Sequence, residues 1–199
     1  MIYFNLDVTL TEMRRGFDEM LVDVLRSQNI EDNQINPTLY TKLFFSYFND
    51  LQPLPRKQAF KAYAQQQNIN SLHSAKAAKR YEELELNATT PRAKTVPIIK
   101  AVSEAMSVGI ITTGTTRLQR QKLRKLKIHD WLDDIRITYD ENQTKQDILA
   151  DLAETKDRLV YVSHDDQDIK AASNADWQTV QSTVDEVSVK ALERINQAS

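Results

Sequence analysis

The sequence predicts an α/β protein in which a doubly wound parallel sheet carries an inserted all-helical cap. Residues 2–4 form a short apolar run that ends in a polar turn, as a buried first strand would. Residues 12–90 then show only helical periodicity, and from Pro91 onward apolar runs alternate with amphipathic segments. We therefore expect a core made of residues 1–11 and 91–199, with a helical cap at 12–90.

The composition limits the classes of partner. The chain has 199 residues, 41% hydrophobic side chains and a formal net charge of −2. That balance gives no electrostatic reason to expect nucleic acid or an anionic membrane as partner. The sequence contains no cysteine, which excludes disulfides and thiolate chemistry and fits a cytoplasmic protein. No signal peptide is predicted, and no apolar run approaches the roughly 20 residues that span a bilayer.

Four helices are predicted for the cap because apolar residues recur there at spacings of three and four. The first runs near 17–25, and the second is opened by Pro37 and covers residues 37–48. Pro53 and Pro55 mark a turn before the third helix, around 59–64. The fourth covers roughly 72–84.

The core is predicted to alternate helices with strands. Helices are expected near 97–106, with Pro97 in the first turn, and at 116–126, 145–153, 169–175 and 184–195. Strands are expected at 108–112, 135–138, 159–162 and 177–180. Because parallel strands gather their carboxyl ends at one edge of the sheet, the chemistry should lie at residues 5–7, 112–114 and 163–168.

Four short motifs at these positions resemble the haloacid dehalogenase-like (HAD) hydrolase superfamily. They are FNLDVTLT, GIITTGTT, TKQDILADL and VYVSHDDQD, in that order along the chain. Members of the family read DxDGT at the first motif, and their fourth motif runs into Gly-Asp with a further aspartate. The resemblance covers essentially the whole chain, including the helical cap after the first strand.

The resemblance implies the chemistry of a magnesium-dependent phosphatase. In that family an aspartate attacks phosphorus, and a second aspartate two residues on serves as acid and base. A hydroxyl and a lysine hold the phosphoryl oxygens, and Mg²⁺ binds between the first and fourth motifs. Matched residue by residue, the acid/base is Asp7 and the later acidic residue is Asp168. The phosphate-binding group would comprise Thr112, Thr113, Gly114 and Lys145.

Three positions depart from the family pattern. Asn5 stands at the nucleophile, Val8 stands at the glycine, and Ser163 with His164 replaces Gly-Asp. An amide is a poor nucleophile, and losing two carboxylates should weaken Mg²⁺ binding. Val8 is expected to keep a negative φ, because a branched side chain strains the left-handed region. The metal position, weakened or lost, would comprise Asn5, Asp7, His164, Asp165 and Asp168.

Each of these assignments has a purely structural alternative. Lys145 could be a solvated helix lysine and Thr112 an ordinary hydroxyl at a strand end. His164 with Asp165 could form a remodelled metal site, but a hydrogen-bonded loop is the favoured interpretation. The basic run at 117–127 is interpreted as a solvated helix face.

Three hypotheses of function follow. The first is a catalytically impaired HAD-like phosphatase fold, leaning toward no enzyme activity, that binds a small phosphorylated molecule or a protein partner. The second is an active metal-dependent hydrolase of a phosphorylated metabolite, which uses Asp7 and a remodelled metal site. The third is a pure interaction module with a vestigial cleft. All three are compatible with a monomer or a dimer.

Overall fold

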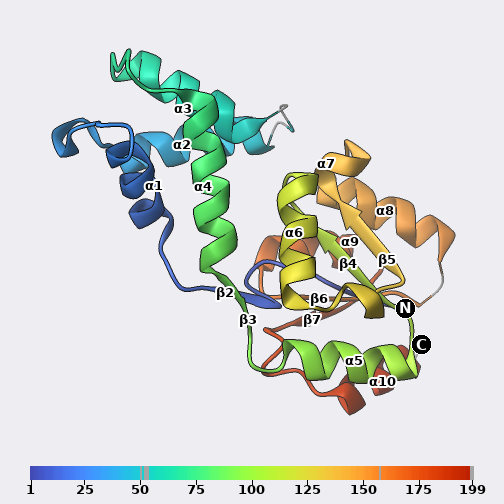
Figure 1. The fold of residues 1–199 in the computed structure, drawn as a ribbon. Helices are drawn as coiled ribbons and strands as arrows, with labels where there is room; N and C mark the ends of the chain where they lie inside the picture. The colour runs from blue at the N-terminus through green and yellow to red at the C-terminus, as the bar shows by residue number, and fades with distance from the viewer. Residues whose placement is uncertain (50, 52–53, 157, 198–199) are drawn as a thin grey trace. The chain divides into compact units, whose positions relative to one another are not determined.

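The computed structural model describes residues 1–49, 51, 54–156 and 158–197 (Figure 1). The chain divides into two compact units, Met1–Glu12 with Thr89–Ser199, and Met13–Ala88. The sequence had placed these boundaries at 11/12 and 90/91. The chain leaves the first unit through β2 (Thr11–Met13) and returns through β3 (Thr89–Pro91), which pair as a two-stranded sheet. This small sheet was not predicted, because each strand has only three residues.

The first unit is built on a five-stranded parallel sheet. Its order is β5-β4-β1-β6-β7, so β1 is central and the strand order reverses there. Phe4, the last residue of β1, pairs with Ile110 of β4 and with Val162 of β6. The carboxyl ends of these three strands therefore lie together, as the sequence predicted. The strands are β1 (Ile2–Phe4), β4 (Val108–Thr112), β5 (Asp134–Ile137), β6 (Val160–Ser163) and β7 (Gln178–Gln181).

Both faces of this sheet are buried against hydrophobic clusters. Successive strand residues point to opposite faces. Ile2 and Phe4 join one hydrophobic cluster, whereas Tyr3 between them joins the other, against Trp177. The helices of the unit are α5 (Thr95–Ala105), α6 (Thr116–Leu126), α7 (Thr138–Glu141), α8 (Lys145–Thr155), α9 (Asp166–Asn174) and α10 (Val189–Gln197).

Most predicted elements of this unit are confirmed within a few residues. The strand at 108–112 and the helix at 116–126 have the predicted bounds. The closing helix was predicted to start at Val184 but starts at Val189. Val184 and Val187 are buried in the preceding loop and mimic a helical apolar spacing. The short α7 and a 3-10 helix at His129–Trp131 were not predicted.

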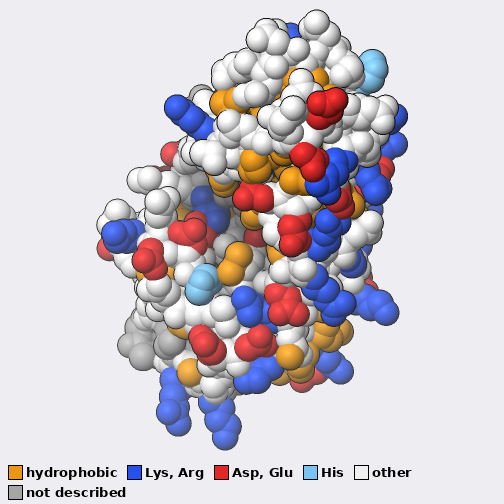
Figure 2. Space-filling view, turned by 90° about the vertical axis from the view of Figure 1, so that its left-hand side faces the viewer, with side chains coloured by type: hydrophobic (Ala, Val, Ile, Leu, Met, Phe, Trp, Pro, Cys, Tyr) orange, Lys and Arg blue, Asp and Glu red, His pale blue; other side chains and the backbone are white. Residues whose placement is uncertain are grey.

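The second unit is helical, as predicted. It contains α1 (Phe17–Arg26), a 3-10 helix (Asp32–Gln34), α2 (Pro37–Asn49), α3 (Pro55–Gln66) and α4 (Ser74–Ala88). One hydrophobic cluster joins the four α-helices, with Tyr40, Phe60 and Tyr81 among its buried members. No described helix of the chain has the length and hydrophobicity to cross a bilayer. On the face shown in Figure 2, acidic and basic side chains are interspersed.

A buried ion pair lies inside this helical core. Arg56 of α3 pairs with Glu85 of α4, and both side chains are below one-tenth exposed. The guanidinium also lies 4.6 Å from the Phe44 ring centre and 4.3 Å from that of Tyr81. Burial disfavours the charged arginine, but the Glu85 carboxylate raises the pKa of Arg56 above its usual value. Removing Glu85 would take the carboxylate partner away from a buried, charged arginine.

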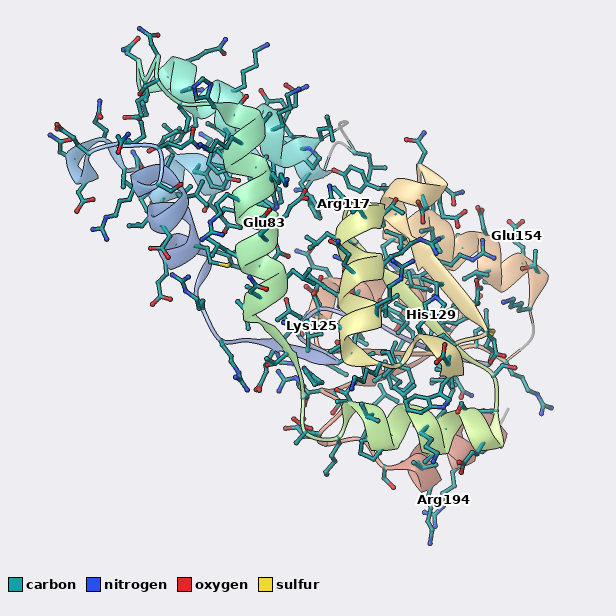
Figure 3. The ribbon with its side chains drawn as sticks, viewed as in Figure 1. Glu83, Arg117, Lys125, His129, Glu154 and Arg194 are labelled. Carbon is teal, nitrogen blue, oxygen red and sulfur yellow. The ribbon has the colours of Figure 1, made fainter. Side chains whose placement is uncertain are left out.

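We expect Glu85→Gln to cost about 3–5 kcal/mol of unfolding free energy, because Arg56 would stay buried and charged. The matched control is Glu83→Gln on the same helix, which removes a half-exposed pair with Arg80 and should cost less than about 1 kcal/mol. Figure 3 labels Glu83 on α4. Urea unfolding followed by circular dichroism measures both. Equal losses in the two variants would contradict a special role for the buried pair.

Candidate functional site

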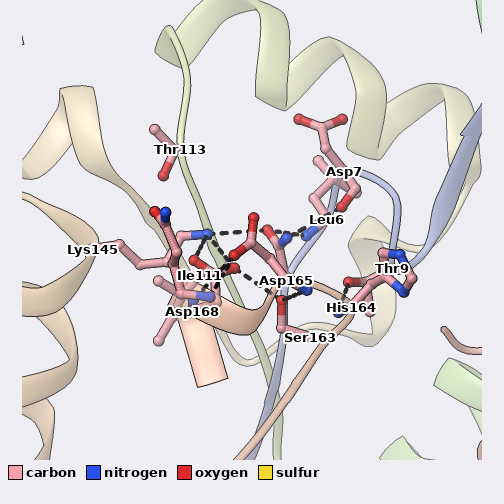
Figure 4. Close-up of polar contacts among 12 residues, drawn as sticks. Leu6, Asp7, Thr9, Ile111, Thr113, Lys145, Ser163, His164, Asp165 and Asp168 are labelled. Atoms are coloured by element: carbon pink, nitrogen blue, oxygen red, sulfur yellow. Dashed lines mark hydrogen bonds and ion pairs between the residues drawn. The ribbon is translucent and has the colours of Figure 1, made fainter. Parts of the chain in front are cut away.

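Four loops of the first unit bring the candidate residues together (Figure 4). Asn5 follows β1, Thr112 ends β4, Ser163 ends β6, and Lys145 is the first residue of α8. The parallel pairing of β1 with β4 and β6 places their ends side by side. The sequence could predict this convergence because it follows from the topology alone.

Asn5 is buried, and both polar atoms of its amide are used within the site. Its Oδ1 accepts a hydrogen bond from the Leu6 N–H at 2.9 Å and a longer one from the Lys145 Nζ at 3.5 Å. Its Nδ2 donates to the backbone carbonyl of Asp7 at 3.2 Å. The amide thus shapes the turn after β1, and it is a poor nucleophile.

Lys145 and Asp168 form the central ion pair of the site. The Lys145 Nζ lies 2.8 Å and 2.6 Å from the two carboxylate oxygens of Asp168. Ser163 Oγ donates to the same carboxylate at 2.9 Å, and the Tyr161 hydroxyl donates at 3.4 Å. Burial, with the Asp168 charge, raises the pKa of Tyr161 well above its usual value, so the phenol stays a donor. Asp168 is therefore surrounded by donors.

The position of Lys145 is explained by this pair and not by the helix that carries it. A lysine in the first turn is unfavourable because the helix dipole is positive there. Thr144 caps α8 by accepting from the Asp147 N–H, and hydrogen bonds from Thr144 lower the pKa of Asp147. That cap offsets the local penalty, and Asp168 supplies the counter-charge.

Asp7 lies in a second network, apart from the first. Lys122 Nζ lies 2.8 Å from its Oδ1, and Gln119 Nε2 donates to its Oδ2 at 3.0 Å. Figure 4 shows the Asp7 carboxylate turned away from Lys145 and Asp168. A proton donor must reach the reacting atoms. Asp7 meets that requirement only after leaving both partners.

The loop after β4 supplies Thr112, Thr113 and Gly114. Thr112 is fully buried, and its hydroxyl has no hydrogen-bond partner among the described residues. The Thr113 carbonyl accepts from Gln119, and the Gly114 N–H donates to the Thr138 hydroxyl at 3.4 Å. Gly114 has a φ of +150°, which favours glycine. The unsatisfied Thr112 hydroxyl is the polar group of this loop that a ligand could satisfy.

The loop after β6 holds His164 and Asp165. The His164 side chain is exposed, and the backbone N–H of His164 donates to Thr9 Oγ1 at 3.0 Å. Asp165 caps α9, because its Oδ1 accepts from the N–H groups of Gln167 at 2.7 Å and Asp168 at 3.3 Å. The structure therefore uses Asp165 to start a helix.

The predicted negative φ of Val8 is wrong. Val8 has a φ of 65°, in the left-handed region. Its N–H donates to Thr11 Oγ1 at 3.3 Å, and its carbonyl accepts from Arg92 Nε at 2.7 Å. Its side chain is about half exposed, so the branched group meets open space. The hydrogen bonds offset a strain of about 1–2 kcal/mol.

As arranged, the predicted metal ligands do not fit a divalent cation. Asn5 is neutral, and the Asp7 carbonyl already accepts from the Asn5 amide. The carboxylates of Asp7 and Asp168 are each held by a lysine. Within the described part of the chain, no three His, Cys, Asp or Glu side chains gather as a metal site. A cation would have to displace ammonium groups to reach either carboxylate.

Sequence reasoning missed Lys122 and Gln119. The basic run at 117–127 was interpreted as a solvated helix face, but Lys122 is 1% exposed. A signal was present, because Leu118, Lys122 and Leu126 are four residues apart and lie on one face of α6. A lysine between two leucines on such a stripe indicates a buried charge that needs a partner.

Comparisons with known proteins agree with this architecture. A family model described as haloacid dehalogenase-like hydrolase matches residues 2–181. No match was found among curated protein sequences.

Solved structures share the fold at low sequence identity. YfnB of Bacillus subtilis, a HAD-hydrolase candidate described as bound to magnesium, has a TM-score of 0.69 at 14% identity, covering 89% of this chain and 86% of its own. A 2-haloacid dehalogenase from Pseudomonas syringae pv. Tomato DC3000 has a TM-score of 0.67 at 14% identity, covering 99% and 97%. An L-2-haloacid dehalogenase from Xanthobacter autotrophicus, with chloropropionic acid covalently bound, has a TM-score of 0.62 at 14% identity, covering 97% and 80%.

We expect Lys145→Met to lower the unfolding free energy by about 2–4 kcal/mol, because Asp168 would remain a mostly buried, unpaired carboxylate. The control is Lys170→Met on α9, where the lysine is exposed and should matter little. Adding Asp168→Asn to Lys145→Met should recover part of the loss. Chemical denaturation measures these three variants and Asp168→Asn alone. A double variant as unstable as the sum of its single variants would contradict the pairing.

Proposed function

The chain belongs to the haloacid dehalogenase-like hydrolase family, and from that membership we propose that it keeps the family's ligand cleft but has lost the covalent hydrolytic step. It would bind a small anionic molecule, a phosphate ester first of all, without turning it over. The observation that carries the proposal is Asn5. A neutral amide stands at the end of the central strand, and both of its polar atoms serve the turn.

The reaction of an intact member requires a carboxylate at this position. Carboxylate attack on phosphorus expels an alcohol and forms an acyl phosphate, whereas attack on a halogen-bearing carbon expels halide and forms an ester; water then cleaves either intermediate. The amide of Asn5 carries no charge, and a product of its attack would not be an ordinary ester. We do not expect Asp7 to replace the nucleophile by activating water. Lys122 and Gln119 of α6 hold both oxygens of its carboxylate, which is turned away from Lys145 (Figure 4).

Binding without a divalent cation is the second part of the proposal. The donor set around Asn5 and Asp168 has lost carboxylates, and Lys145 already neutralises Asp168. Mg²⁺ binding would therefore be weak or absent. The alternative metal site at His164 and Asp165 has little support, because Asp165 is engaged as a helix cap.

The ligand anion would be held beside Lys145 and Thr112. The Lys145 ammonium supplies positive charge in a mostly buried setting, where hydrogen bonds to charged groups are strong. The Thr112 hydroxyl lacks a partner among the described residues, and an anion that reached it would supply one. In this proposal the cleft is a binding site that keeps its hydrogen-bond donors but lacks the nucleophilic carboxylate.

Turnover assays test the loss of catalysis. Wild type should not hydrolyse p-nitrophenyl phosphate with Mg²⁺ or Mn²⁺, and should release no chloride from 2-chloropropionate. Asn5→Asp restores the nucleophile, and adding His164→Asp restores an acidic residue of the fourth motif. We expect at least one of the two variants to gain about 100-fold over wild type on one substrate.

The control for that assay is mass spectrometry of residue 5, since deamidation of Asn5 would itself create aspartate. Wild-type turnover above the deamidated fraction would overturn the proposal. Which substrate responds also matters, because halide leaves as an anion and needs no proton donor, whereas a phosphate ester does.

Thermal unfolding tests the binding site. Inorganic phosphate at about 100 times its dissociation constant should stabilise wild type by about 2.7 kcal/mol, and EDTA should leave this shift unchanged. Thr112→Val should keep or raise the melting temperature without phosphate, because it removes a buried unsatisfied hydroxyl.

The same substitution should remove most of the phosphate shift. Thr179→Val on β7 is the matched control, since the Thr179 hydroxyl makes an exposed contact with Ser173. A phosphate shift that survives Thr112→Val, or that vanishes with EDTA, would contradict the proposed binding mode.

A further inference from the structure

The proposed function does not explain the orientation of the Asp7 carboxylate. It is turned away from Lys145 and Asp168 and faces α6 (Figure 4). Lys122 holds one oxygen at 2.8 Å and Gln119 holds the other at 3.0 Å. Both donors come from one helix and lie three residues apart, so they point to the same side.

Burial makes this contact favourable for the lysine. The Lys122 side chain is 1% exposed, whereas that of Asp7 is 36% exposed. A buried ammonium is costly unless a charged partner compensates it. If the Asp7 carboxylate turned to solvent, the buried Lys122 would lose this carboxylate partner.

Gln119 extends the contact to the loop after β4. Its Nε2 donates both to Asp7 and to the Thr113 carbonyl at 3.0 Å, so its two hydrogens are used. The same nitrogen lies against Gly114, where an added Cβ would be only 2.3 Å away. One buried amide therefore fastens the loop after β1 to the loop after β4.

We propose that Lys122 and Gln119 are positioning residues that hold Asp7 against α6, so that Asp7 anchors the two loops and is kept from acting as a proton donor. The inference rests on the proposed function only in treating the ends of β1, β4 and β6 as one ligand cleft. It adds a restraint that is separate from the amide at Asn5. Restoring the nucleophile alone should therefore give slow turnover.

The direct test is a ¹⁵N NMR measurement on the lysine side chains of wild type, which needs no catalysis. The Lys122 ammonium, assigned by its loss in Lys122→Met, should give a signal protected from solvent exchange. Asp7→Asn should shift that signal or abolish its protection. Lys170 of α9, which is exposed, should show no protection and serves as the internal control. A Lys122 signal that ignores Asp7→Asn would overturn the inference.

The second test uses the repaired chain, Asn5→Asp with His164→Asp. Adding Lys122→Met preserves the length of the apolar stem but removes the charge that holds Asp7. We expect the kcat on p-nitrophenyl phosphate with Mg²⁺ to rise about tenfold with little change in KM, because a freed carboxylate can donate a proton. Lys122→Arg should keep the low rate, and Lys125→Met should leave it unaltered.

The outcomes separate this inference from the proposed function. A folded Lys122→Met variant of the repaired chain with equal or lower kcat would overturn the restraint on Asp7. Active wild type would overturn the loss of catalysis, while a protected, Asp7-dependent Lys122 signal would still support the restraint. A repaired chain that stays silent leaves the NMR measurement as the deciding result.

Discussion

Two lysines, each neutralised by a carboxylate from another segment, hold the loops of the α/β unit in place. Lys145 of α8 pairs with Asp168 of α9, and Lys122 of α6 pairs with Asp7 after β1. Each pair crosses between segments far apart in the sequence. Because a mostly buried charge without its partner is costly, each pair fixes the relative position of the segments that carry it.

This arrangement also changes the electrostatics that the family pattern implies. An intact magnesium site gathers carboxylates around a divalent cation. Here the acidic residues are fewer, and ammonium groups supply the positive charge from within the chain. The Asn5 amide fits the same logic, since it donates to the Asp7 carbonyl and accepts from Lys145. The remaining carboxylates of the site, Asp7 and Asp168, are each paired with an ammonium group.

Features that follow from local sequence patterns were predictable, whereas features set by contacts between distant residues were not. Apolar periodicity and parallel pairing identified the sheet, the helical insertion and the meeting of Asn5, Thr112 and Ser163 at one edge. The orientation of Asp7 was beyond that reasoning, because its partners are more than a hundred residues away. The φ of Val8 was missed because hydrogen bonds with Thr11 and with the distant Arg92 hold a backbone conformation that local sterics disfavour.

The sequence by itself determined the family, the order of the elements and the loss of a carboxylate at residue 5, because these follow from residue identity and local periodicity. Only the tertiary structure decided how the remaining charges are paired. Lys122 looks like one of several surface cations until α6 packs and covers it. Asp165 looks like a metal ligand until α9 begins beside it and takes it as a cap. Charges act through space, so their partners are fixed only when the chain is folded.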